Sequence, residues 1–125
     1  MALENAAEGG VRETWGALAA AWQALHAEHL EARAVFRRIA EEEAEHAELS
    51  RAVDQWLQSR LSAAERREVE LTKRRALHAL QRELAVEEPH STVTQFAGVP
   101  NRLRSLDLLA RLSEELFPMG WTERA

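Results

Sequence analysis

The feature that most constrains this chain is a long stretch from Glu31 to Gln58 that contains neither proline nor glycine. Within it, apolar positions recur in steps of three and four residues, and such steps place side chains on one face of an α-helix. The spacing predicts one helix over 31–58, which at 1.5 Å per residue is roughly 42 Å long, a length typical of helical bundles. The predicted inner stripe of this helix, with Trp56 beside it as a further core candidate, consists of Phe36, Ile39, Glu43, His46, Ser50, Val53 and Leu57.

A helix over 3–27 precedes this one, because the same spacing recurs near the start of the chain. Its stripe extends backwards through Glu8, and a short turn at 27–30 separates the two helices. Gly9 and Gly10 each weaken helix propensity by about 1 kcal/mol, so the helix begins either before or just after them. The apolar residues of this stripe, which we expect in the core, are Val11, Trp15, Leu18, Trp22 and Leu25.

Two more helices are predicted in the second half of the chain. Ser62 and Glu65 form a capping box that starts a helix over 62–87, and Pro89 ends it. Residues 90–98 are predicted to be a loop, and a last helix follows over 101–117, with a short tail that contains Trp121. The fold class is therefore an all-α, antiparallel bundle of about four helices in a single domain over 1–125.

Composition excludes several classes of function. The 125 residues contain no cysteine, which rules out disulfide scaffolds, cysteine zinc sites and thiol catalysis. The net charge of −5 argues against nucleic acid as a partner. No apolar run reaches the roughly 18 residues that a membrane span needs, and no basic and apolar leader opens the chain. We therefore expect a cytoplasmic protein that does not bind membranes.

Two residues of the inner stripe of 31–58 are not apolar. Glu43 and His46 are three residues apart, so their side chains leave one face of the helix about one turn apart. A Glu-x-x-His pair that projects into a bundle is a ligand pair of carboxylate-bridged metal sites, and its oxygen and nitrogen donors suit iron, manganese or zinc. Two readings compete with a metal site: a solvated face in the glutamate-rich stretch 41–48, and an i,i+4 pair between Glu42 and His46.

The stretch 30–57, and above all Ile39-Ala40-Glu41-Glu42-Glu43-Ala44-Glu45-His46-Ala47, resembles the ferritin-like superfamily, particularly rubrerythrin-type proteins. The resemblance covers about residues 5–58. It implies a lone glutamate on the preceding helix, 30 to 35 residues upstream of Glu43, and Glu8 fits this on the stripe, with Glu13 as the substitute. The implied metal ligands are Glu8, Glu43 and His46. The implied cofactor is iron, either as a single ion or as a di-iron pair, with manganese or zinc as alternatives.

Ferritin-like domains normally hold two such helix pairs, whereas this chain has one, over 1–58, followed by two further helices and a tail over 59–125. One chain therefore supplies half a di-metal site, and a homodimer would complete it, because a two-fold interface duplicates every ligand. The family binds or oxidises iron or reduces peroxide. The alternative function is a non-catalytic helical interaction or assembly protein with a vestigial metal motif, in which Glu43 and His46 pair with arginines such as Arg12 or Arg51.

Overall fold

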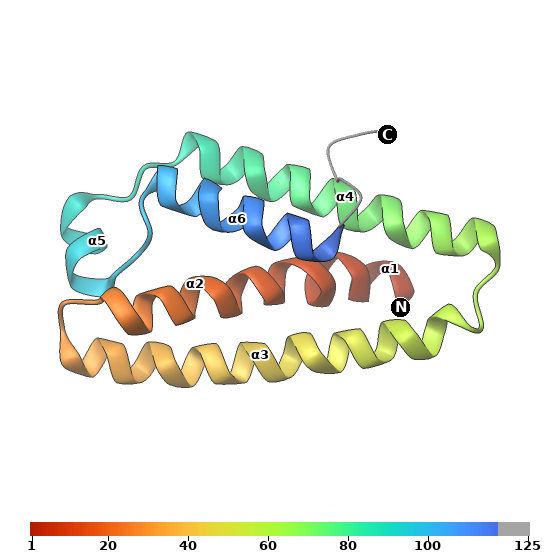
Figure 1. Ribbon diagram of the computed structural model, residues 1–125, viewed down its shortest axis with the longest axis horizontal. Helices are drawn as coiled ribbons and strands as arrows, with labels where there is room; N and C mark the ends of the chain where they lie inside the picture. Colours follow the sequence, from red (N-terminus) through yellow and green to blue (C-terminus); the bar gives the residue numbers. More distant parts are fainter. Residues whose placement is uncertain (118–125) are drawn as a thin grey trace.

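The computed structural model of the chain describes residues 1–117, and these form helices joined by short connections (Figure 1). The predicted all-α, antiparallel bundle is confirmed. The tail that contains Trp121 lies outside the described residues. In chain order the helices are α1 (Ala2–Glu4), η1 (Asn5–Arg12), α2 (Glu13–His26), α3 (Leu30–Gln58), α4 (Ala63–Val86), α5 (Ser91–Ala97) and α6 (Arg102–Leu116).

The predicted helix over 3–27 is present, but its first part is not α-helical. α1, η1 and α2 follow one another without a break, and η1 is a π-helix in which the N–H of Glu13 donates to the carbonyl of Glu8, five residues earlier. This wider turn changes which residues face inward: Ala6, Gly9 and Val11 are buried, while Glu8 is exposed. The expectation that Glu8 continues the inward stripe was therefore wrong, because a period of 3.6 residues does not hold across η1.

The prediction of a loop over 90–98 was also wrong. The ring Nδ1 of His90 accepts a hydrogen bond from the N–H of Thr92 at 3.2 Å and caps the N-terminus of α5. Gly98, with φ of 67°, ends the helix in the left-handed conformation that glycine adopts without strain. α5 closes one end of the bundle, where its carbonyl at Gln95 accepts from the N–H of Glu28 (Figure 1).

The other helix bounds agree with the prediction to within a residue or two. The capping box at the start of α4 is present in full: the N–H of Glu65 donates to the Ser62 hydroxyl at 3.1 Å, and the N–H of Ser62 donates to the Glu65 carboxylate at 3.0 Å. No helix of residues 1–117 is long and apolar enough to cross a membrane.

The helices lie in three layers, with η1 and α2 between α3 on one side and α4 and α6 on the other (Figure 1). The hydrophobic core fills the space between the middle layer and α4 and α6, and α3 takes no part in it. Trp15 and Leu18 pack against this core, as predicted, whereas Trp56 on α3 is 54% exposed and does not belong to it. The core residues are Val11, Leu77, Leu80, Leu109, Leu112 and Phe117.

α3 is attached to the middle layer through small residues. A Cβ placed on Gly9 would lie 1.7 Å from the Oγ of Ser50, and one on Gly16 would lie 3.7 Å from a carboxylate oxygen of Glu43. Glycine is required for the close approach at position 9, whereas the contact at position 16 is an ordinary van der Waals contact. Although α3 is 29 residues long, its buried residues are only Ala47 and Ser50. Most of the surface of α3 is thus left uncovered by its own chain.

Candidate functional site

The two predicted ligands on α3 differ in their surroundings. Glu43 is half-buried, with its carboxylate against Gly16 of α2. His46 is exposed, so the expectation that both side chains point inward holds only for Glu43. The reason is a rotation of α3. Its face toward η1 and α2 passes through Phe36, Glu43, Ala47 and Ser50, and His46 lies to the side of this face.

Glu8 lies on η1 near an ion pair with α4. The guanidinium of Arg12 donates two hydrogen bonds to the carboxylate of Glu83, at 2.8 and 3.2 Å. These bonds raise the pKa of Arg12, and the negative charges of Glu83 and Glu8 raise it further. Gly9 contacts Ser50 and Gly16 lies against Glu43, so η1 and α2 run antiparallel to α3. Glu8 therefore lies beyond the level of Ser50, more than one helical turn of α3 from His46.

One chain does not gather these ligands into a site. Among residues 1–117 there is no group of three histidine, cysteine, aspartate or glutamate side chains that could hold a metal ion. Glu8 and His46 are exposed, and the substitute Glu13 is half-buried on α2. A metal site built from Glu8, Glu43 and His46 therefore requires a second chain, and that part of the prediction stays a prediction.

A row of exposed apolar residues follows α3 beside the face that contacts α2. Its members recur in steps of four and three residues, so they share one side of the helix. Four of them are well exposed: Val35 at 56%, Ile39 at 37%, Leu49 at 65% and Trp56 at 54%. Polar residues occupy only its middle. We call this row the outer stripe, and it consists of Val35, Ile39, Glu42, His46, Leu49, Val53 and Trp56.

The apolar arc of α3 is therefore wider than α2 can cover. The predicted inner stripe runs along the middle of this apolar arc. η1 and α2 cover one side of the arc, the side with Phe36, Glu43 and Ser50. Its other side, with Ile39 and His46, belongs to the outer stripe and faces away from the chain's own core. Contiguous exposed apolar residues bounded by charged ones are typical of protein–protein contacts.

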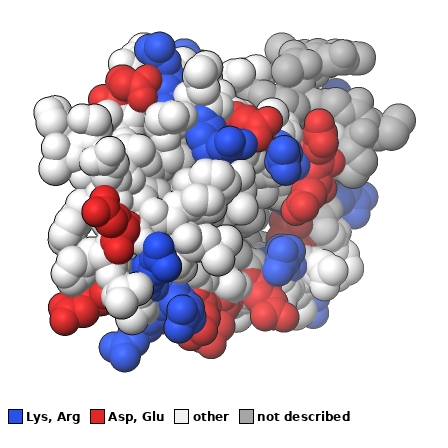
Figure 2. All heavy atoms as spheres, turned by 60° about the vertical axis from the view of Figure 1, so that its left-hand side comes forward, with Lys and Arg blue, Asp and Glu red and all other residues white. Residues whose placement is uncertain are grey.

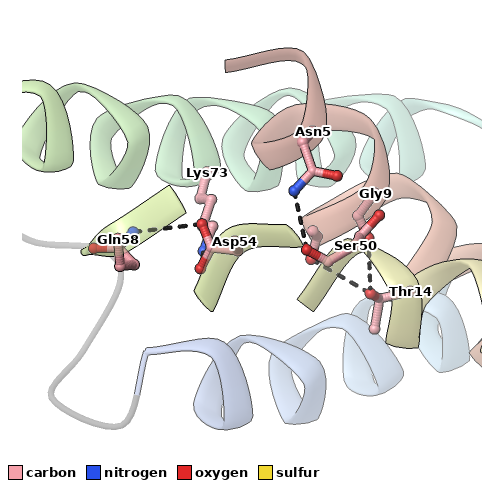
Figure 3. Close-up of polar contacts among 8 residues, drawn as sticks. Asn5, Gly9, Thr14, Ser50, Asp54, Gln58 and Lys73 are labelled. Atoms are coloured by element: carbon pink, nitrogen blue, oxygen red, sulfur yellow. Dashed lines mark hydrogen bonds and ion pairs between the residues drawn. The ribbon is translucent and has the colours of Figure 1, made fainter. Parts of the chain in front are cut away.

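A polar cluster lies where η1, α3 and α4 meet (Figure 3). The ammonium of Lys73 contacts the carboxylate of Asp54 at 3.1 Å, with both side chains about three-quarters buried, and the amide of Gln58 also donates to Asp54. The amide of Asn5 donates to the backbone carbonyl of Ser50 at 3.0 Å. The sequence carried a signal for part of this cluster. Ser50 belongs to the predicted inner stripe of 31–58, and Lys73 lies four residues from each of the buried residues Val69 and Leu77, where an apolar residue is expected.

A cavity of about 220 Å³ adjoins this cluster, between η1, α3, α4 and α6. Its walls combine the Asp54–Lys73 pair with Thr14 and, from α6, Leu112 and Leu116. The cavity is smaller than the roughly 300 Å³ or more of a typical ligand pocket. In the described part of the chain no buried side-chain nitrogen or oxygen lacks a hydrogen-bond partner. The cluster is therefore satisfied by its own contacts, and we assign it a structural role that ties α3 to α4.

The end of the bundle at α5 carries a second exposed apolar area. Residues 91–101 contain no charged side chain. Figure 2 looks obliquely at this end and shows a broad uncharged surface with acidic and basic residues mixed along its lower edge. The ring of Phe96 packs on His29 with centroids 5.0 Å apart. The large apolar residues exposed around this end are Leu25, Leu30, Val86, Val93, Phe96 and Leu103.

No family model, curated protein or solved structure matches the chain. The likeness to ferritin-like proteins therefore rests on the Glu-x-x-His motif of α3 and on the helix before it.

Proposed function

We propose that this protein is a ferritin-like metal-binding protein that acts as a cytoplasmic homodimer, with a transition metal, iron first, held between the two chains. The observation that carries the proposal is the outer stripe of α3, whose apolar residues are interrupted only at its middle, where His46 lies. An exposed apolar row favours burial against a partner, and burial of this row would enclose the imidazole of His46 together with the neighbouring carboxylates.

The donor set supports this choice of cofactor. Each chain offers the carboxylate of Glu43, half-buried and held against Gly16, and the imidazole of His46 one turn away. Glu8, the third proposed ligand, is exposed on η1 beside Arg12, more than one helical turn from the level of His46. A two-fold dimer doubles this set to four carboxylates and two imidazoles, which are hard and borderline donors suited to iron, manganese or zinc. We propose no catalytic residue.

Loss of thermal stability on metal removal tests this function. A ligand that binds only the folded dimer raises its melting temperature. The protein, purified without a metal-affinity column, should therefore melt at a lower temperature after treatment with a chelator and recover when iron is added. His46→Ala should abolish this response. Glu48→Gln, an exposed change on α3 outside the outer stripe, should keep it.

One result would contradict the proposed metal site, and a second measurement would then identify the alternative function. If the wild-type protein melts at the same temperature with and without chelator, no metal is bound and the Glu-x-x-His motif is vestigial. If it is then still a dimer, the second function stands: a non-catalytic helical assembly protein that uses the outer stripe for association alone. The half-buried position of Glu43 against Gly16, which needs no metal, favours this second function.

A further inference from the structure

We propose that the outer stripe of α3 pairs with the outer stripe of a second copy of this chain, antiparallel, so that Glu42 of each copy faces His46 of the other. The inference rests on the proposed homodimer and specifies which surfaces form it and in which register. The outer-stripe residues that face each other in this register run from Val35 to Val53, a contact roughly 27 Å long at 1.5 Å per residue. It adds Glu42, which the sequence motif leaves outside the ligand set, to the residues of the shared site.

The step pattern of the outer stripe selects the register. Successive members of the outer stripe are separated by four or three residues. When two such stripes run antiparallel, their side chains interleave only if each four-residue interval of one copy lies opposite a four-residue interval of the other. The steps match when Glu42 of one copy faces His46 of the other. In that register Ile39 faces Leu49 and Val35 faces Val53, so every apolar residue between them meets an apolar residue.

Other arrangements of the same two stripes are worse. A shift of one heptad keeps the steps matched but places Glu42 against Val53 or against Ile39, where a carboxylate would be buried without a partner. Parallel pairing would place Glu42 against its own copy, and like charges in direct contact are destabilising. The antiparallel register with Glu42 opposite His46 has neither a buried carboxylate without a partner nor two like charges in contact. Charge and apolar matching thus agree on a second copy of this chain as the occupant of the outer stripe.

This register also gives Glu42 a task at the proposed metal site. A histidine that binds a metal through one ring nitrogen usually donates its other ring N–H to a carboxylate, which fixes the orientation of the ring. Across the dimer, Glu42 of one copy would accept this hydrogen bond from His46 of the other. Glu42 is thereby a positioning residue and not a ligand.

Cysteine cross-linking tests the register, because the chain contains no cysteine of its own. A disulfide requires Cα atoms about 4.4–6.8 Å apart. Residues 39 and 49 of one helix are about 15 Å apart, so an Ile39→Cys/Leu49→Cys variant cannot cross-link within one chain. Under mild oxidation this variant should become mostly covalent dimer. The single variant Ile39→Cys reports parallel pairing, and Ile39→Cys/Trp56→Cys reports the antiparallel register that is shifted by one heptad and places Glu42 against Val53; both should remain mostly uncross-linked.

Sedimentation equilibrium provides the second measurement and separates the two proposals. Glu42→Lys should weaken dimerisation about tenfold or more, because it places a cation against the imidazole of the other copy. His46→Glu should do the same by placing two carboxylates together. With every protein measured in the presence of a chelator, so that metal does not contribute, the double variant Glu42→Lys/His46→Glu should restore the wild-type constant. A wild-type protein that remains monomeric would overturn the homodimer and this register together. A dimer that cross-links through the single Ile39→Cys variant, or whose double variant shows no rescue, would overturn the register alone.

Discussion

The two adjacent glycines of η1 should respond in opposite ways to the same substitution. A Cβ on Gly9 would lie 1.7 Å from the Oγ and 2.5 Å from the Cβ of Ser50, so α3 must move away from η1 or Ser50 must change its position. A Cβ on Gly10 would lie 3.5 Å from the nearest heavy atom, the Cε of Lys73, which is ordinary van der Waals contact. Gly9→Ala and Gly10→Ala are therefore a matched pair in one helical turn.

The magnitudes follow from two opposing effects. Replacement of a helical glycine by alanine stabilises by about 0.4–1 kcal/mol where the backbone tolerates it, and this is the whole effect expected for Gly10→Ala. Overpacking typically costs about 1–3 kcal/mol, which exceeds that gain. Gly9→Ala should therefore be destabilising by about 1–2 kcal/mol. The two variants should differ by about 2–3 kcal/mol, or roughly 8 °C or more in melting temperature for a domain of this size.

Thermal unfolding followed by circular dichroism at one protein concentration measures this difference. The cause can be checked with Ser50→Gly, which removes the two nearest atoms that a Cβ on Gly9 would meet and leaves only the Oδ1 of Asn5 at 3.3 Å. In a double-mutant cycle, Gly9→Ala should cost less in the Ser50→Gly background than in the wild type. If Gly9→Ala and Gly10→Ala melt at the same temperature, the close contact between η1 and α3 is not present as described, and the reasoning fails.

Three further predictions concern other parts of the fold. Ser62→Ala removes the hydroxyl that caps α4 and should cost about 1 kcal/mol in urea unfolding. The hydrogen bonds from Arg12 lower the pKa of Glu83. Their contribution to stability is therefore complete above the ordinary glutamate pKa of about 4.3 and is lost as the pH falls through the lowered pKa. The difference in melting temperature between wild type and Glu83→Gln, measured from pH 7 to pH 3, should disappear at the acidic end. Gly98→Ala combines a left-handed backbone with a Cβ 2.5 Å from the backbone nitrogen of Ala27, and should lower the melting temperature more than Ser62→Ala does.

Much of the fold could be predicted because it depends on local rules. The three-and-four spacing and the Ser62 capping box located all four long helices to within a few residues. The π-helical segment was missed because its hydrogen bonds span five residues instead of four, so its period is longer than the one used to extend the stripe to Glu8. The helix α5 was missed because its start depends on the ring of His90, which is not a common N-cap side chain.

The candidate site was harder to predict, because it depends on which part of an apolar arc a neighbour covers. The spacing predicted that Glu43 and His46 lie on the same broad face of the helix, and they do. However, α2 covers only the part of this face that holds Glu43. Gly9, which allows the close approach of η1 to α3, carries no apolar signal. The contact between Asp54 and Lys73 joins two residues on different helices that are 19 positions apart in the sequence, and no local pattern predicts it.

The mass of the protein under native conditions tests the central claim most directly. The chain weighs 14.1 kDa, and native mass spectrometry of protein purified without a metal-affinity column should show twice that mass plus one or two metal ions. Exchange into a chelator should remove the added metal mass from the wild-type protein, and His46→Ala should never carry it. A species at the mass of a single metal-free chain, at micromolar concentration and moderate salt, would contradict both the homodimer and the shared metal site.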